Sequence, residues 1–207
     1  MATHAQEIEV KIKLLSKEDY DRFEQHMGPP KDIIDQENVY FDGSDKEITK
    51  HRSSVRLRFF HDEQTGVEKC VMTHKGKSNM TGGVSSVEET EEEISVSAAR
   101  AAVEQPQLMH EWRGELIDMI RDRYRVQDFV CLNGFRNIRK RYDWEGHVLE
   151  FDYVIYPFGV NYEIEVETTE AVTLKPKLTQ LLDSLNIKYQ DSKRSKFANF
   201  IHGSVAL

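Results

Sequence analysis

Charged side chains of the same sign recur two residues apart along this chain of 207 residues, and the first such pair is Glu7 and Glu9, followed by Lys11. On an extended strand, residues at this spacing point to the same side. Two neighbouring carboxylates can hold a divalent cation such as Mg²⁺ or Mn²⁺, which prefer oxygen ligands. Paired arginines suit bidentate contacts with phosphate oxygens. The spacing therefore predicts metal-assisted chemistry on a phosphorylated polyanion.

The other pairs alternate with apolar residues in the same way. In SVEETEEEI, at 86–94, the spacing leaves two pairs open, because Glu89 and Glu91 share one face while Glu88 and Glu92 share the other. The remaining pairs are wholly basic or wholly acidic: Arg56 and Arg58, Lys75 and Lys77, Arg139 and Arg141, Glu150 and Asp152, and the triplet Glu163, Glu165 and Glu167.

Strands must position these side chains, since the alternation has a period of two. A sheet with one wet face gives the same alternation. Like charges on neighbouring positions repel, however, and their repetition favours a face that is neutralised by a ligand. We expect strands at 7–14, 38–41, 55–60, 67–74, 84–94, 135–142, 148–154 and 162–168, with turns that include DEQTG at 62–66.

Helices are expected in the gaps, from the spacing of apolar residues and from capping signals. Strands and helices together predict an antiparallel α+β domain, and closure into a barrel would turn the charged faces inward. The first expected helix begins after Ser16 and ends before Gly28, and the second is capped by Ser97 and runs towards Pro106. Further helices are expected over 111–125, 174–185 and 197–201, the last of them closed by Gly203.

The composition sets broad limits on function. The chain is 31% charged and 39% apolar, with a net charge of -8 that disfavours bulk nucleic-acid binding. No apolar run approaches the roughly 18 residues of a membrane helix, and the N-terminus lacks a signal pattern. Two cysteines, Cys70 and Cys131, do not make a disulfide framework. We expect a cytoplasmic protein without membrane or nucleic-acid partners.

The ordered set of motifs resembles the CYTH superfamily, the triphosphate tunnel metalloenzymes. It begins with ExExK at 7–11 and continues through the pairs above to ExExE at 163–167, and Lys196 follows in an SKF context. The set covers nearly the whole chain. The closest resemblance is to the plant tripolyphosphatase branch, through VRLRFF, VEETEEEI and YEIEVET.

The resemblance implies a single domain over residues 1–207, built as an eight-stranded antiparallel β-barrel with a charged interior, surrounding helices and one or two Mg²⁺ or Mn²⁺ ions. It favours Glu89 and Glu91 over the alternative pair, and it ranks Glu150 below Asp152. The implied metal ligands are Glu7, Glu9, Glu165, Glu167, Glu163, Asp152, Glu89 and Glu91. The implied substrate-binding residues are Lys11, Arg56, Arg58, Lys75, Lys77, Arg139, Arg141 and Lys196. The implied catalytic residues are Lys11, Glu89, Glu91 and Lys196. We expect Lys13 to be solvated.

The implied activity is hydrolysis of a small-molecule triphosphate, tripolyphosphate, to pyrophosphate and phosphate. The alternatives are an adenylate cyclase, which makes cyclic AMP and pyrophosphate from ATP, and a hydrolase of an organic triphosphate such as thiamine triphosphate or ATP. An RNA 5′-triphosphatase would need a basic track, which the net charge of -8 disfavours. A non-catalytic polyphosphate sensor would not need so many carboxylates. The sequence leaves the preferred metal and the oligomeric state open.

Overall fold

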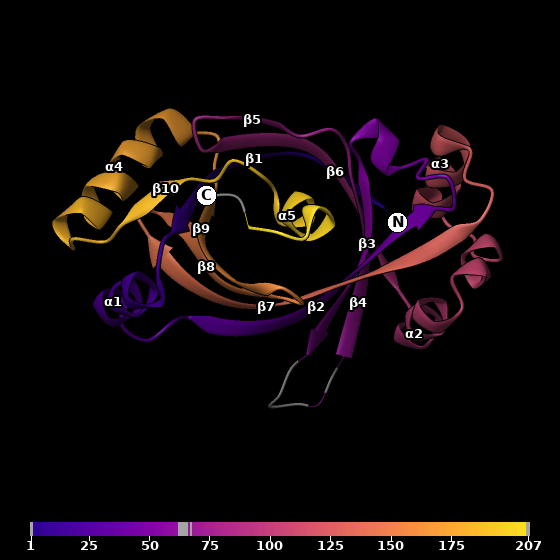
Figure 1. Ribbon diagram of the computed structural model, residues 1–207, viewed down its shortest axis with the longest axis horizontal. Coiled ribbons are helices and arrows are strands. Elements are labelled where there is room, and N and C mark those ends of the chain that lie inside the picture. The colour runs from indigo at the N-terminus through magenta and orange to yellow at the C-terminus, as the bar shows by residue number, and fades with distance from the viewer. Residues whose placement is uncertain (1, 62–65, 67, 206–207) are drawn as a thin grey trace. The chain divides into compact units, whose positions relative to one another are not determined.

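The structure is a computed structural model that describes residues 2–61, 66 and 68–205, and its elements are labelled in Figure 1. The strands are β1 Thr3–Leu14, β2 Asp32–Gly43, β3 Ser54–His61, β4 Glu68–Lys75, β5 Asn79–Thr81, β6 Val84–Ile94, β7 Phe129–Trp144, β8 His147–Tyr156, β9 Gly159–Glu167 and β10 Tyr189–Asp191. The α-helices are α1 Lys17–Met27, α2 Val96–Glu104, α3 Glu115–Tyr124, α4 Ala171–Ser184 and α5 Lys196–His202, and the 3-10 helices are η1 Thr49–His51 and η2 Pro106–His110.

The strands form one sheet that closes on itself. Their order is β10-β1-β9-β8-β7-β2-β3-β4-β6-β5, and β1 also pairs with β6. This additional pairing joins the two ends of the eight longer strands, while β5 and β10 extend the sheet beyond the ring. The prediction of an α+β fold with a closed, eight-stranded antiparallel β-barrel is confirmed.

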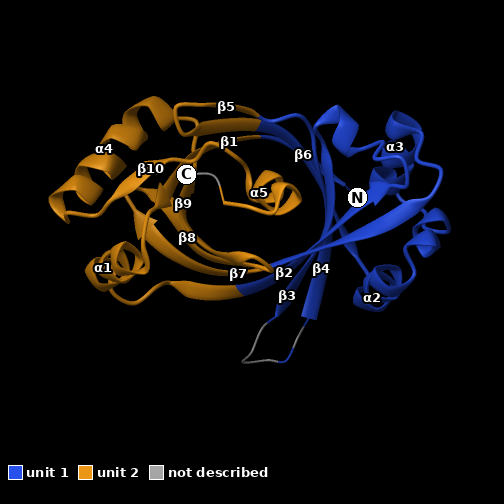
Figure 2. Ribbon diagram, viewed as in Figure 1, with its two compact units in different colours: residues 1–6, 35–78, 87–135 blue, residues 7–34, 79–86, 136–207 orange. Residues whose placement is uncertain are grey.

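The chain divides into two compact units, coloured in Figure 2. Unit 1 contains residues 1–6, 35–78 and 87–135, and unit 2 contains residues 7–34, 79–86 and 136–207. Each unit is assembled from segments that are distant in the sequence. The expectation of a single domain over the whole chain stays a prediction.

In unit 2, the apolar side of the strands packs against α1 and α4. Val10 and Ile12 of β1 are fully buried there together with Ile164 of β9. Tyr20 of α1 stacks on Phe151 of β8, with ring centroids 4.2 Å apart. Burial of these side chains fixes which side of each strand faces the helices, and the charged residues at alternate positions must lie on the opposite face.

Unit 1 repeats this arrangement with other elements. Val55, Leu57 and Phe59 of β3 are fully buried in a core that also contains Leu116 and Ile120 of α3. The arginines between the β3 core residues consequently project from the other side of the sheet. Helices therefore cover the apolar face in both units.

The expected strands are found, and 84–94 coincides with β6. Two short strands, β5 and β10, were not predicted, because three residues each are too few to show an alternation. In the expected turn at 62–66, residues 62–65 lie outside the described residues, as does Val67 at the start of the expected fourth strand.

Helix ends were predicted with mixed success. Ser16 caps α1 as expected, since its Oγ accepts a hydrogen bond from the backbone N of Asp19 at 3.1 Å. The prediction that Ser97 caps a helix is wrong, because α2 already starts at Val96, after Ser95. The helix expected over 111–125 starts only at Glu115, because residues 111–114, between the end of η2 at His110 and the start of α3, are not helical. Within the described residues, no helix has both the length and the apolar character to cross a membrane.

Candidate functional site

Four neighbouring strands of unit 2, in the order β7, β8, β9 and β1, align their charged residues in two rows across the sheet. In each row a base on β7 and a base on β1 flank two acids on β8 and β9. Acids directly opposite each other repel, so the middle of this face needs cations from elsewhere. The first row is Arg141, Glu150, Glu165 and Lys11, and the second is Arg139, Asp152, Glu163 and Lys13.

Arg139 supplies one such cation from the β7 side. Its Nε and Nη2 donate to the two carboxylate oxygens of Asp152 at 2.7 and 2.6 Å, a bidentate pair. Nη2 also donates to Glu165 Oε2 at 2.8 Å, and Nη1 forms an ion pair with Glu150. One guanidinium therefore contacts three of the four acids in the middle of the face.

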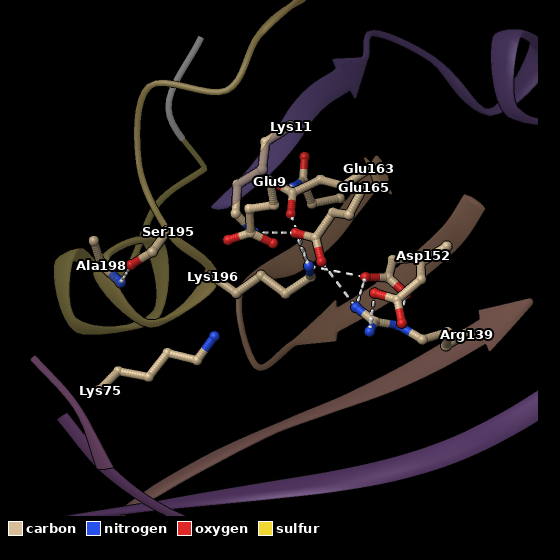
Figure 3. A network of polar contacts seen from close by, with 12 residues as sticks. Glu9, Lys11, Lys75, Arg139, Asp152, Glu163, Glu165, Ser195, Lys196 and Ala198 are labelled. Atoms are coloured by element: carbon tan, nitrogen blue, oxygen red, sulfur yellow. Dashed lines mark hydrogen bonds and ion pairs between the residues drawn. The ribbon is translucent and has the colours of Figure 1, made fainter. Parts of the chain in front are cut away.

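Lys196 supplies a second cation from helix α5. Ser195 Oγ caps this helix by accepting from the backbone N of Ala198 at 3.1 Å, which places Lys196 at its first position. The Lys196 ammonium lies 2.8 Å from Asp152 Oδ2 and 3.1 Å from Glu163 Oε2, and it also contacts Glu165. Figure 3 shows the ammonium pointing between these carboxylates.

Lys11 and Glu9, both on β1, complete the network. The Lys11 ammonium lies 3.1 Å from Glu9 Oε1 and forms an ion pair with Glu165. We call the residues joined by these contacts the acid–base cluster: Glu9, Lys11, Arg139, Glu150, Asp152, Glu163, Glu165 and Lys196.

Most of the acid–base cluster is buried. The side chain of Asp152 is 0% exposed and that of Glu165 is 5% exposed. Burial alone would raise the pKa of Glu165, but Lys11, Lys196 and Arg139 outweigh it and hold that pKa well below its usual range. Burial would lower the pKa of Lys196, yet the carboxylates of Asp152, Glu165 and Glu163 raise it well above its ordinary value. The same opposition between burial and the facing carboxylates raises the pKa of Lys11.

The acid–base cluster contains five carboxylates and only three cations. Counting Lys13 as a fourth cation still leaves an excess of negative charge. Among the described residues, no three His, Cys, Asp or Glu side chains are arranged to hold a metal ion, and the carboxylates contact the three cations instead. The donor set itself, oxygen ligands with an excess of negative charge, fits Mg²⁺ or Mn²⁺.

Four charged residues of unit 2 for which the sequence predicts a placement are not members of the acid–base cluster. Arg141 donates through Nε and Nη2 to the carboxylate of Asp32, at 2.7 and 2.6 Å. Glu7 is half-buried and Glu167 is exposed. The expectation that Lys13 is solvated is wrong. Its exposed fraction is 8%, because β1 continues to Leu14 and is flanked at Lys13 by both β9 and β10.

Unit 1 carries a smaller charged face. Arg56 Nη2 donates to Thr73 Oγ1 at 3.2 Å and lies 3.9 Å from Glu89, whose other oxygen is 3.2 Å from the Lys75 ammonium. Thr73 donates in turn to Glu91 Oε1 at 2.9 Å. The structure thus brings two predicted bases and two predicted acids of unit 1 together through a threonine that the sequence analysis did not single out.

The other candidates from unit 1 have different surroundings. Arg58 Nε donates to Asn38 Oδ1 at 3.1 Å. Lys77 follows the end of β4 and is exposed. Of the alternative acidic pair, Glu88 lies 3.6 Å from Arg123, and Glu92 accepts from the backbone N of Leu116 at the start of α3. The alternative pair therefore serves α3, and Glu89 and Glu91 share the face with the arginines.

Comparisons with known proteins agree with this arrangement. The model of the CYTH domain matches residues 5–200. A solved structure of a putative adenylyl cyclase from Hippeastrum, described as having a dominant triphosphatase activity, is 34% identical with a TM-score of 0.87, and the match covers 97% of each chain. A putative adenylate cyclase from Bacillus halodurans is 26% identical with a TM-score of 0.72, over 95% of this chain and 98% of that one. Comparison with curated protein sequences gives no match.

Proposed function

The chain belongs to the CYTH domain family, and from this premise we propose that it is a metal-dependent hydrolase that cleaves tripolyphosphate into pyrophosphate and phosphate. The observation that carries the proposal is the acid–base cluster of unit 2, in which buried carboxylates outnumber the buried cations that face them.

A cluster that served only stability would balance its charges, because an uncompensated buried charge is strongly unfavourable. Here acids lie opposite acids on β8 and β9, and the pairs Glu150 with Glu165 and Asp152 with Glu163 are in register. A divalent cation would neutralise this excess, and the basic residues beside it would hold the anion that the cation accompanies. A polyphosphate with a bound metal satisfies both halves of the cluster.

The proposed roles follow from position. Glu9, Asp152, Glu163 and Glu165 present the carboxylate oxygens for the metal. When bound, the metal supplies charge neutralisation and activation of a water molecule. Lys11 and Lys196 exchange their present carboxylate partners for phosphate oxygens when the substrate arrives, and they stabilise the negative charge that develops on the leaving group.

We further propose that the charged face of unit 1 binds phosphate oxygens through Arg56, Arg58 and Lys75, and that Glu89 and Glu91 orient water. Arg141 and Lys77 are not included in this proposal, since Arg141 is paired with Asp32 and Lys77 is exposed beyond β4.

The relatives support a triphosphate as the substrate class. The Hippeastrum protein is described by its dominant triphosphatase activity, although it is also described as a putative adenylyl cyclase. The Bacillus protein is described as a putative adenylate cyclase. These descriptions make cyclisation of ATP the second candidate, which would use the same carboxylates and cations with a ribose hydroxyl in place of water.

The test is to incubate the purified protein with tripolyphosphate, ATP or thiamine triphosphate, each with Mg²⁺ or Mn²⁺, and to identify the products by chromatography. We expect orthophosphate and pyrophosphate from tripolyphosphate. Cyclic AMP with pyrophosphate as the main products from ATP would replace the proposal by the cyclase. The absence of turnover with every substrate, despite tight binding, would replace it by a sensor.

A matched pair of variants tests the site. We expect Glu9→Gln to lower metal-dependent activity by about 10- to 100-fold or more, the range seen when groups that support a metal are removed. The control is Glu104→Gln, which changes an exposed glutamate at the end of α2 and leaves activity unchanged. Full activity in the Glu9 variant would show that the metal lies elsewhere.

A further inference from the structure

Asn161 is a buried residue of β9 that lies two positions before Glu163 and therefore shares its face. Its exposed fraction is 1%. The side-chain Nδ2 donates a hydrogen bond to Glu163 Oε1 at 2.8 Å. The other amide atom, Oδ1, is buried and has no hydrogen-bond partner among the described residues. Its cross-strand neighbour on β8, Val154, is fully buried and carries no polar group that could serve.

An amide oxygen in this position is unfavourable for the fold alone. A buried acceptor without a partner costs about 1–3 kcal/mol, and most such groups in folded proteins are satisfied. The orientation of the amide is fixed by its neighbour, because only the NH₂ side can donate to the Glu163 carboxylate. The oxygen therefore needs a donor or a cation that the described chain does not provide.

The cation of the acid–base cluster that contacts Glu163 already has its full set of partners. An ammonium has three donors, and that of Lys196 contacts three carboxylates: Asp152, Glu163 and Glu165. No proton of Lys196 remains for Asn161 while these contacts persist. An amide carbonyl is, however, one of the oxygen ligands that hard divalent cations accept beside carboxylates.

We propose that Asn161 is a further ligand of the site, whose Nδ2 positions the Glu163 carboxylate and whose Oδ1 binds the divalent cation together with Glu163. The inference rests on the proposed function for the presence of that cation, and it adds a neutral oxygen to a ligand set that the sequence predicted to be wholly acidic. Metal binding accounts for the burial of an unpaired acceptor that would otherwise destabilise the fold.

The experiment measures Mn²⁺ binding by titration calorimetry without substrate, and thermal unfolding without metal, for the whole protein and its variants. Asn161→Leu keeps the approximate shape of the side chain and removes both polar atoms. We expect its Mn²⁺ affinity to be about 10- to 100-fold weaker, the usual effect of losing a group that supports a metal. Its unfolding temperature without metal should be no lower than that of the wild type, because the unpaired acceptor is removed as well.

A matched control comes from the apolar core. The hydroxyl of Tyr142 is also buried without a partner in the described chain, but it lies in the core of unit 2. Tyr142→Phe should leave Mn²⁺ affinity unchanged. Asn161→Ser, whose shorter side chain cannot reach Glu163, should weaken Mn²⁺ binding as much as Asn161→Leu does. If Asn161→Leu does not fold, the Mn²⁺ affinity of Asn161→Ser tests the inference in its place.

Three results would overturn the inference. Wild-type Mn²⁺ affinity in the Asn161 variants, with metal-dependent hydrolysis in the wild type, would reject the role of Asn161 and leave the proposed function intact. A loss of affinity in Tyr142→Phe as large as that in Asn161→Leu would show that the effect is not specific to the site. Failure of the wild type itself to bind Mn²⁺ or Mg²⁺ would reject the inference together with the proposed function.

Discussion

Removal of the guanidinium of Arg139 tests the electrostatic description of the acid–base cluster. Arg139→Met keeps most of the aliphatic volume and deletes the group that pairs with Asp152, Glu165 and Glu150. Removing one partner of a buried ion pair costs about 3–5 kcal/mol, because it leaves a buried charge uncompensated. Asp152 and Glu165 both keep their contacts with Lys196, so we expect the lower end, about 3 kcal/mol at pH 7.

This destabilisation should depend on pH with a defined sign. In the wild type, burial opposes ionisation of Asp152, but Arg139 and Lys196 lower its pKa below the usual value. The resulting stability is present above the unfolded pKa, about 3.9, and is lost as the pH falls through the folded pKa. Without Arg139, burial weighs more heavily and the folded pKa of Asp152 rises. Protonation of Asp152 can then remove the uncompensated buried charge of the variant. The difference in the free energy of unfolding between wild type and variant should therefore shrink as the pH falls from 7 towards 4.

Urea unfolding of both proteins at several pH values measures this difference as a change in the free energy of unfolding. The double variant Arg139→Met with Asp152→Asn removes the buried charge along with its partner, and it should recover part of the loss at pH 7. A deficit below about 1 kcal/mol, the scale of an exposed ion pair, would refute the reasoning, and so would a deficit that does not change with pH.

Three further predictions concern other parts of the chain. Added Mn²⁺ at 100 times its Kd should raise the free energy of unfolding by about 2.7 kcal/mol, reversed by a chelator; no shift would contradict a resident metal. Ser16→Ala removes the cap of α1 and should cost about 1 kcal/mol in urea unfolding, whereas Ser184→Ala, at the exposed end of α4, should cost less. Burial lowers the pKa of His74 to about 4. NMR should therefore show a neutral His74 imidazole at pH 6, and the histidine contributes stability above its unfolded pKa that is lost as the pH falls towards 4.

The sequence predicts the face of a strand on which a side chain lies better than it predicts the residue that this side chain contacts. Alternation placed Arg56 and Asp152 on the side of their strands that faces away from the apolar core, because burial of the intervening apolar residues fixes the side. For Glu89 the alternation left both sides open, and only the resemblance favoured it. The pairing of Arg141 with Asp32 was not predictable, since it depends on where β2 begins relative to β7. Register between strands that are distant in the sequence is set by the packed fold and leaves no local trace.

Two polar residues show where a signal existed and was missed. Lys13 continues the alternation of Glu9 and Lys11, and the same rule that placed those residues places it on the same face. Asn161 continues the alternation of Glu163 and Glu165 in the other direction. Lys13 was expected to be solvated because the strand was expected to leave the barrel at that point, and Asn161 was passed over because a neutral amide lies outside the same-sign pairs. Burial treats all residues of one face alike.

The arrangement of charges explains how the chain can carry like-charged pairs on successive strands. Along each strand the pairs repel, but across the sheet the two acidic strands β8 and β9 lie between the bases of β7 and β1. The bases neutralise the acids of β8 and β9 only on the sides that face β7 and β1. Between β8 and β9, where Asp152 faces Glu163, the negative charge needs a cation from outside the four strands. Lys196 fills this place from α5. A divalent ion that binds Asp152 and Glu163 must therefore compete with the Lys196 ammonium, so Lys196→Met should bind Mn²⁺ more tightly than the wild type even if it hydrolyses triphosphate more slowly. Equal affinity in calorimetry would place the metal away from these two carboxylates.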